Sequence, residues 1–295
     1  MISQTPIESL PNELLIELLS LFPTRELLPL TAVSRHFYSI TLDILKQRLI
    51  CAISLPDHRL ILECYQPSAR LSTPYLYCDY LYTDNALYAQ EDKSGSFGQT
   101  LSSLRHTYSH FRPVVQEENK RPRARYPPRV AQPKSQSAKH EENGDANASS
   151  SSWQLETVPS VDISLDVDEM FAQLCTTTNL VKMGPKPGLF VSHINLSDGL
   201  IRVKRDWLAA NLDDADRILW ADPEHTVGVR FSVQENKSSG TKGPVLLAEW
   251  EEAPVEYQLN FEELVVRTLT LLNMVEKSED QEIFTEGNAV VIASF

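Results

Sequence analysis

Two histidines, one cysteine and one acidic segment are the side chains of this sequence that could bind a metal ion or act as a nucleophile. His106 and His110 are four residues apart, so on a helix they would share one face, as pairs of metal ligands do. No cysteine lies near them, and a metal site is the weaker interpretation. The segment 211–216 holds three aspartates but lacks the glycine and the final glutamate of a calcium loop. Cys175 stands among threonines with no evident base, which favours a buried thiol over a nucleophile.

Motifs that define enzyme active sites are missing from the sequence. It has no glycine-rich phosphate loop, no G-x-S-x-G and no H-E-x-x-H, and only ten of its 295 residues are glycine. We therefore predict no catalytic residues, no metal ligands and no cofactor. A formal net charge of −13 argues against nucleic acid as a partner of the body of the protein.

Cysteine usage and hydropathy indicate the cellular compartment. The four cysteines, Cys51, Cys64, Cys78 and Cys175, have no C-x-x-C spacing, which favours reduced and mostly buried thiols. No stretch approaches the ~20 apolar residues of a membrane span. The first thirty residues lack the basic start and apolar run of a secretory signal. We expect a cytoplasmic or nuclear protein with no membrane partner.

The stretch Leu10–Phe37 predicts short helices with more apolar surface than their own packing can bury. From residue 13 to 22, polar side chains occur only at Glu13, Glu17 and Ser20. They are four and three residues apart, so on a helix they form one narrow stripe. Leucine, isoleucine and phenylalanine cover the rest. Such a helix needs a second apolar surface besides the helices that follow it.

Capping residues and one proline set the expected helix boundaries in this stretch. Thr24 can cap the second helix, and either Ser34 or Thr31 can cap the third. Pro29 falls inside the second helix and removes one backbone hydrogen bond, so we expect that helix to be short or kinked. A unit of about 45 residues buries little surface, so partner binding should contribute to its stability.

Five short motifs follow one another in this region. They are Leu10-Pro11, Glu13-Leu14-Leu15, Pro23, Arg25-Glu26-Leu27-Leu28 and Val33-Ser34-Arg35-His36-Phe37. Together they resemble an F-box, a three-helix module, over about residues 8–49. The resemblance implies docking on a Skp-type adaptor and, through it, on the cullin of a Skp–cullin–F-box ubiquitin ligase. The residues that it places against or beneath the adaptor are Leu10, Pro11, Leu14, Leu15, Leu18, Leu19, Leu27, Leu30, Val33 and Phe37.

From residue 158 onward, apolar and polar side chains alternate with a period of two. Val227–Val233 is the clearest case, and Val161–Leu165 and Val255–Phe261 follow the same pattern. The Asp198-Gly199 pair between two such runs predicts a hairpin. Several short strands with turns between them predict an antiparallel sandwich or open barrel. The period then changes to that of a helix, expected at Glu262–Lys277.

The composition divides the chain into five parts. Residues 59–64 and 75–82 also have strand patterns, whereas the segment near 115–152 has few large apolar side chains and predicts disorder. We expect an α+β multidomain protein with an F-box at 1–55, a β-sandwich domain at 56–115 and 158–278, a disordered insert at 116–157 and a tail at 279–295. The insert carries a basic run, either a nuclear-import signal or a solvated charge run, at Lys120, Arg121, Arg123, Arg125 and Arg129.

The second part of the β domain carries a second resemblance. The segments SHINLSDGLIRVKRDWLA, ILWAD and VEYQLNFEELVVRT lie within residues 189–276. They resemble the C-terminal domain of fungal F-box proteins, which is similar to the phloem-lectin-like domains of plants. The resemblance implies a domain that reads a substrate or ligand. Aromatic side chains that could stack on a carbohydrate, although each also suits a core, are Trp207, Trp220, Trp250 and Tyr257.

Two functions of different classes remain open. The first is a non-catalytic substrate receptor of a Skp–cullin–F-box ubiquitin ligase, which binds the adaptor through the F-box and an unidentified protein substrate through the β domain. Ubiquitin transfer would then rest on proximity, because the receptor itself performs no chemistry. The alternative is a carbohydrate- or glycoprotein-binding, lectin-like module that the F-box only tethers.

Overall fold

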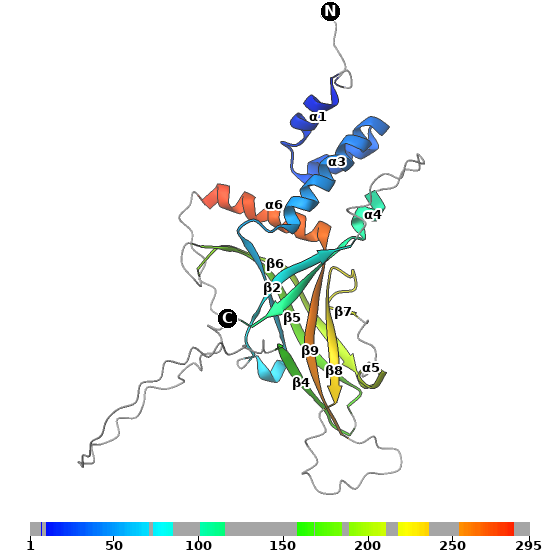
Figure 1. Cartoon of the computed structure of the whole chain (residues 1–295), viewed down its shortest axis with the longest axis vertical. Coiled ribbons are helices and arrows are strands. Elements are labelled where there is room, and N and C mark those ends of the chain that lie inside the picture. Colours follow the sequence, from blue (N-terminus) through cyan, green and yellow to red (C-terminus); the bar gives the residue numbers. More distant parts are fainter. Residues whose placement is uncertain are drawn as a thin grey trace, which may run out of the picture.

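The structure is a computed structural model that describes residues 7, 10–70, 73–84, 101–115, 158–167, 169–184, 189–210, 218–235 and 254–285. A helical N-terminal lobe lies at one end, and a strongly curved sheet forms most of the remainder (Figure 1). The predicted order, N-terminal helices and then an antiparallel β domain with a late helix, is confirmed.

Four helical segments form the N-terminal lobe: α1 (Asn12–Leu19), α2 (Thr24–Leu27), the 3-10 helix η2 (Leu28–Ala32) and α3 (Arg35–Ile53). Pro29 lies in the first turn of η2, and the α-helix stops before it. The expectation of a short second helix is thereby confirmed, because proline cannot donate the next α-helical hydrogen bond. Ser34 caps α3 as predicted, since its hydroxyl accepts a hydrogen bond from the N–H of Phe37.

The described residues of the β domain form one antiparallel sheet of nine strands. Their order is β6-β5-β1-β2-β3-β9-β8-β7, and β4 also pairs with β9. The strands are β1 (His58–Tyr65), β2 (Leu76–Thr83), β3 (Tyr108–Val114), β4 (Ser160–Leu165), β5 (Phe171–Met183), β6 (Phe190–Lys204), β7 (Ile218–Trp220), β8 (Val227–Glu235) and β9 (Val255–Arg267). The helices of this part are η3 (Pro67–Ala69), α4 (Leu101–Arg105), α5 (Arg205–Ala210) and α6 (Thr268–Thr285). Strands β1, β2 and β3, which precede segment 116–157, therefore lie side by side in the same sheet, flanked on both sides by strands that follow the segment.

The sheet curls until its two end strands approach, so an open barrel describes it better than two stacked sheets. Gly199 of β6 lies against Ala221, directly after β7, and a Cβ at Gly199 would overlap the Ala221 carbonyl oxygen. The predicted hairpin at Asp198-Gly199 is wrong, because β6 runs through it unbroken. The pairing of β6 with β5 shifts register between Thr178 and Asn179 instead. Here glycine permits a close approach of two backbones, not a turn.

The late helix begins at Thr268, later than the expected Glu262, because β9 continues to Arg267. The extra strand residues pair with β3 on one side and with β8 on the other. Leu264, Val265 and Val266 are each at most 1% exposed, as is typical of a strand covered on both faces. Hydrogen bonds to a strand on each side therefore keep this segment extended, although its leucines and valines have the spacing of a helix.

Helix α3 belongs to two apolar cores. Its Phe37, Ile40 and Ile44 pack with α1 and α2 in the core of the lobe. The opposite side of α3 enters the barrel core with Leu42, Leu45, Leu49, Ala52 and Ile53. Helix α6 lies across the same end of the barrel and contacts both α3 and β6 (Figure 1). The lobe and the barrel are thus joined by packed side chains and not by a free linker.

Candidate functional sites

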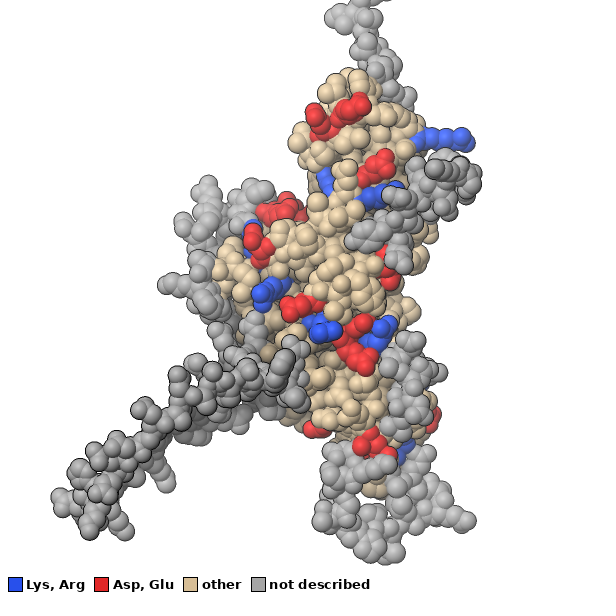
Figure 2. All heavy atoms as spheres, in the orientation of Figure 1, with Lys and Arg blue, Asp and Glu red and all other residues tan. Residues whose placement is uncertain are grey.

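Helix α1 buries apolar side chains on one side and exposes them on the other. Leu15 and Leu19 are at most 3% exposed, whereas Leu14 is 50% and Leu18 is 41% exposed. The exposed side chains, which we call the α1 surface, are Leu10, Pro11, Leu14, Leu18, Leu21 and Phe22. In Figure 2 the visible surface of the lobe is uncharged over much of its area, interrupted by several acidic and basic side chains. A contiguous apolar surface that remains exposed although the core beneath it is fully packed is typical of an interaction site.

The residues predicted to contact or support an adaptor fall into two groups. Leu10, Pro11, Leu14, Leu18 and Val33 are exposed, and Leu30 is half-buried. Leu15, Leu19, Leu27 and Phe37 form the lobe core beneath them. Leu21 and Phe22 extend the exposed group but were not predicted, although they continue the same apolar run. An open depression of ≈ 600 Å³ next to the exposed Val33 is lined by Thr31, Ala32, Ser34, Arg35 and Tyr38.

Arg48 of α3 holds the C-terminal end of α1. Its Nη2 donates to the carbonyl oxygens of Ser20, at 2.9 Å, and Phe22, at 2.5 Å. These carbonyls follow the last turn of α1, where backbone acceptors lack helical partners and a cation is favourable. Nη1 of the same guanidinium donates to Thr24 Oγ1 at 3.1 Å and to Glu276 Oε1 at 3.0 Å.

The start of α2 is held by a residue from the far end of the chain. Thr24 was predicted to cap α2, but the capping position is Pro23, whose side chain offers no acceptor. Instead, the Thr24 N–H donates to Glu276 Oε2 at 3.1 Å, and the Thr24 hydroxyl donates to Oε1 at 2.6 Å. The carboxylate of α6 thus satisfies a backbone donor that a local cap would otherwise take. No sequence pattern links residues 252 positions apart, so this contact was not predicted.

The aromatic side chains predicted for ligand stacking lie in different environments. Tyr257 is 7% exposed, and burial raises the pKa of its hydroxyl. Trp207 is half-buried against the barrel core. Trp220 is half-buried on the outer face of the sheet, stacked on His225 at 4.8 Å and 5.4 Å from the ring of Tyr108. Trp250 lies outside the described residues, and so does the basic run at 120–129.

The position of Trp220 depends on a glycine in the neighbouring strand. Val227 and Val229 point into the barrel core, so Gly228 between them faces outward. Trp220 pairs with Gly228 across β7 and β8, and a Cβ at Gly228 would lie 2.8 Å from the indole ring. The indole therefore fills the space that the missing side chain leaves.

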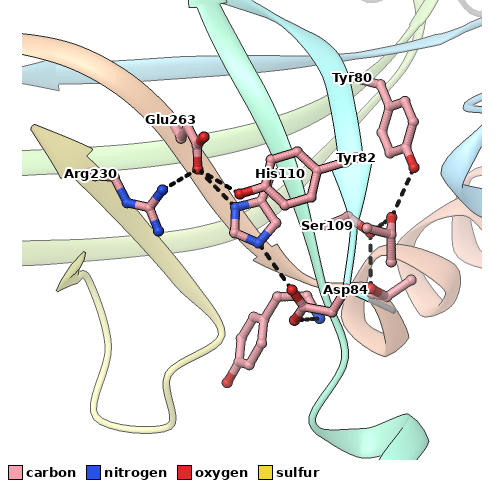
Figure 3. A network of polar contacts seen from close by, with 10 residues as sticks. Tyr80, Tyr82, Asp84, Ser109, His110, Arg230 and Glu263 are labelled. Carbon is pink, nitrogen blue, oxygen red and sulfur yellow. Dashed lines mark hydrogen bonds and ion pairs between the residues drawn. The ribbon is translucent and has the colours of Figure 1, made fainter. Parts of the chain in front are cut away.

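Four side chains from the neighbouring strands β2, β3, β9 and β8, and Asp84 directly after β2, meet on the same outer face (Figure 3). Glu263 Oε2 accepts hydrogen bonds from Arg230 Nη1 at 2.8 Å, from His110 Nδ1 at 2.9 Å and from the Tyr82 hydroxyl at 3.4 Å. Asp84 Oδ1 lies 3.5 Å from the other ring nitrogen of His110. The Tyr82 ring stacks on the His110 ring at 4.2 Å between centroids. We call these five residues the outer polar cluster.

Three members of the outer polar cluster are largely covered: the side chains of His110, Glu263 and Arg230 are 7%, 17% and 19% exposed. The hydroxyls of Ser109 and Thr83, each next in sequence to a member of the cluster, instead form a buried chain with Thr268, with each O–O distance 2.9 Å (Figure 3). Tyr82, by contrast, is 44% exposed. His110 was considered as a metal ligand with His106 on a helix, but it lies in β3 and His106 precedes that strand. In the sequence, only the position of His110 directly before the apolar Phe111 indicated that, in a strand, the histidine would point away from the core.

All four cysteines are free thiols: Cys64 and Cys78 are buried, Cys175 is half-buried and not fully buried as expected, and Cys51 is exposed. Burial raises the pKa of the Cys64 thiol to about 12 and raises that of Cys78 further, so both remain neutral thiols. Within the described residues, no three side chains of histidine, cysteine, aspartate or glutamate are grouped so that they could hold a metal ion. None of the described helices has the length and apolar composition to cross a membrane.

Comparison with known proteins identifies the N-terminal lobe alone. The model of the F-box-like family matches residues 7–52, the segment that contains α1, α2, η2 and nearly all of α3. No curated protein and no solved structure matches the chain. The chain therefore carries an F-box-like domain, which supports a role as an adaptor-binding protein of ubiquitin ligases.

Proposed function

We propose that this protein is the substrate-receptor subunit of a Skp–cullin–F-box ubiquitin ligase, and that the α1 surface binds the Skp-type adaptor. The observation that carries the proposal is the exposure of Leu14 and Leu18 over a lobe whose core is already filled. Both side chains lie within the segment matched by the F-box-like family. Burying them under a partner would remove apolar area from water, which is the main favourable term in association.

The β domain would bind a protein substrate on the outer face that holds Tyr82, Tyr108, Trp220 and Arg230. Tyrosine, tryptophan and arginine are the side chains most enriched where protein interfaces are strongest. In this arrangement the receptor needs no catalytic residue, because it holds a substrate lysine near a charged conjugating enzyme. The cullin would be reached through the adaptor.

The carbohydrate-binding alternative rests on fewer described residues. Tyr257 is in the core and Trp207 packs against it, which leaves Trp220 as the described outward-facing candidate. The indole of Trp220 is itself covered by His225 on one side. A glycan array probed with the full-length protein separates the two functions. Reproducible binding that is lost in Trp220→Ala would support the alternative.

Adaptor capture is the direct test of the proposed function. Full-length protein and a Leu10→Ala/Pro11→Ala variant are compared as baits for purified Skp-type adaptor and its cullin. We expect the wild-type chain to capture both and the variant to lose both. A matched control, Met170→Ala/Leu200→Ala, removes exposed apolar side chains from the β domain and should capture normally. Equal capture by all three proteins would refute the assignment.

A further inference from the structure

One polar bridge ties the adaptor-docking helices to the last helix of the chain. We define the Arg48–Glu276 bridge as Thr24, Arg48 and Glu276, which lie on α2, α3 and α6. Both oxygens of the Glu276 carboxylate are used, Oε1 by Arg48 and the Thr24 hydroxyl and Oε2 by the Thr24 N–H. The side chains of Arg48 and Glu276 are only 19% and 23% exposed. Charge-assisted hydrogen bonds in such a setting are stronger than an exposed ion pair.

Helix α6 fixes the Glu276 carboxylate relative to the barrel. Leu272 and Val275, on the turn before Glu276, are buried in the barrel core. Ser278, two residues later, is fully buried; its hydroxyl contacts His58 Nε2 at 2.9 Å and also bonds the Ser192 hydroxyl. His58 begins β1 and Ser192 lies in β6, so α6 is held by both apolar and polar contacts. The carboxylate can take its observed place only when α6 is packed on the finished barrel.

The other end of the bridge leads directly to the α1 surface. The Arg48 guanidinium binds Glu276 and also the carbonyl oxygens of Ser20 and Phe22, which close α1. Without Glu276, the Thr24 N–H would lose its acceptor, and Arg48 would lose the carboxylate that orients it. Arg48 would keep its bonds to the Thr24 hydroxyl and to the two carbonyls, but the link from these groups to α6 would be lost.

We propose that Glu276 is a positioning residue for adaptor docking, so that the α1 surface is competent only when α6 has packed on the barrel. This inference rests on the proposed function of the α1 surface. Helix α6 follows every strand of the described sheet along the chain. High adaptor affinity would therefore require a folded substrate-binding domain. A chain whose barrel is only partly folded would bind the adaptor weakly and would be incorporated less into the ligase.

The size of the effect follows from the fraction of molecules with a competent lobe. The apparent dissociation constant equals the intrinsic constant divided by that fraction. Loss of a helix cap together with one buried charged hydrogen bond is enough to reduce the competent fraction about tenfold. We therefore expect adaptor affinity to fall about tenfold in Glu276→Ala. Contacts of the adaptor with the α1 side chains themselves would be unchanged.

The experiment compares full-length Glu276→Ala with Glu279→Ala, its matched control. Glu279 is exposed three residues further along the same helix, so the control removes the same charge without the bridge. Adaptor affinity is measured by titration calorimetry, and amide hydrogen exchange is followed in peptides that cover residues 20–28. All four tryptophans lie after residue 150 and none in the lobe, so tryptophan fluorescence follows unfolding of the β domain and not of the lobe.

The inference predicts weaker adaptor binding and faster exchange at residues 20–28 in Glu276→Ala, with an unchanged fluorescence transition. Glu276→Gln keeps one acceptor oxygen and should fall between the wild type and the alanine variant. Unchanged adaptor affinity in Glu276→Ala would overturn the inference. So would a fluorescence transition that shifts as much as the affinity does, because Glu276 would then merely stabilise the barrel. Failure of the proposed function looks different: in that case Leu14→Ala/Leu18→Ala binds the adaptor as well as the wild type.

Discussion

The two sides of α1 should respond to the same chemical change in different ways, one through adaptor affinity and the other through stability. Leu14 and Leu18 are 50% and 41% exposed, whereas Leu15 and Leu19 are 0% and 3% exposed. One pair of leucine-to-alanine changes, Leu14→Ala/Leu18→Ala, trims the α1 surface. The other, Leu15→Ala/Leu19→Ala, cuts into the lobe core. Both variants remove the same atoms from the same helix, so differences in helix propensity cancel.

The magnitudes follow from how much surface each leucine has left to bury. Full burial of a leucine side chain is worth about 1.5–3 kcal/mol, so a half-exposed one that becomes covered contributes roughly 1 kcal/mol. Two of them correspond to ~2 kcal/mol, or an adaptor affinity about 30-fold weaker. The exposed pair should leave the free energy of unfolding within about 0.5 kcal/mol of the wild type. Each buried leucine, by contrast, is worth about 2–5 kcal/mol of stability when cut to alanine.

Calorimetric titration with adaptor and circular dichroism at increasing temperature measure the two quantities separately. The exposed pair should lose affinity with an unchanged melting curve. The buried pair should lose the helical signal of the lobe first and lose binding as a consequence. An exposed-pair variant that keeps its affinity within threefold, or melts like the buried pair, would contradict our account of α1.

Three further predictions concern the β domain. Gly199→Val should destabilise the barrel by about 1–3 kcal/mol in urea unfolding, because the side chain has no space beside the Ala221 carbonyl; an unchanged midpoint would contradict the close approach of β6. Glu263→Ala should lower the free energy of unfolding by about 1–3 kcal/mol, since it leaves Arg230 without its carboxylate, whereas Glu262→Ala on the same strand should have little effect. Burial raises the pKa of Cys64 to about 12, so folding favours its neutral thiol. The resulting stability is complete below the unfolded pKa of about 8.5 and is lost as pH rises from there towards 12, and Cys64→Ala should flatten that part of the stability curve.

The elements that the sequence predicts well are those whose pattern is local. The alternation in Val227–Val233 and Val161–Leu165 survives in β8 and β4, and Pro29 ends α2 where the missing N–H requires it. Ser34 caps α3 because a serine hydroxyl needs only the next turn to find its partner. The sequence also predicted that some apolar side chains of α1 would be exposed, because the stretch has more of them than three short helices can bury.

Strand β5 was missed because several of its buried side chains are polar. Thr176, Thr178 and Asn179 are each at most 3% exposed, so the strand shows no apolar and polar alternation. Asn179 is satisfied by a hydrogen bond from Asn195 of β6, and Thr176 contacts the thiol of Cys64 in β1. These partners come from other strands, and a single segment cannot reveal them. The β-branched threonines were the remaining signal for a strand.

The outer polar cluster and the Arg48–Glu276 bridge were missed for the same reason. Glu263 reads as one of several acidic residues on a solvated edge until β9 lies between β3 and β8. Only then do Arg230 and His110 come within hydrogen-bond distance of one carboxylate oxygen. Glu276 likewise reads as an ordinary charge on a helix, and its partners lie on two helices more than 200 residues earlier.

If the proposed function holds, the sharing of α3 between two cores would affect ubiquitin transfer. Leu45 and Leu49 of α3 are buried in the barrel core, while Phe37 and Ile44 of the same helix are buried with α1. A helix packed in this way cannot pivot without exposing one of the two sets, and each buried leucine opposes that by about 1.5–3 kcal/mol. A substrate on the outer face of the sheet would therefore keep a fixed orientation relative to the adaptor. Catalysis by proximity gains from such a fixed arrangement, because a lysine that is held near the conjugating enzyme does not have to be found anew by diffusion of a flexible arm.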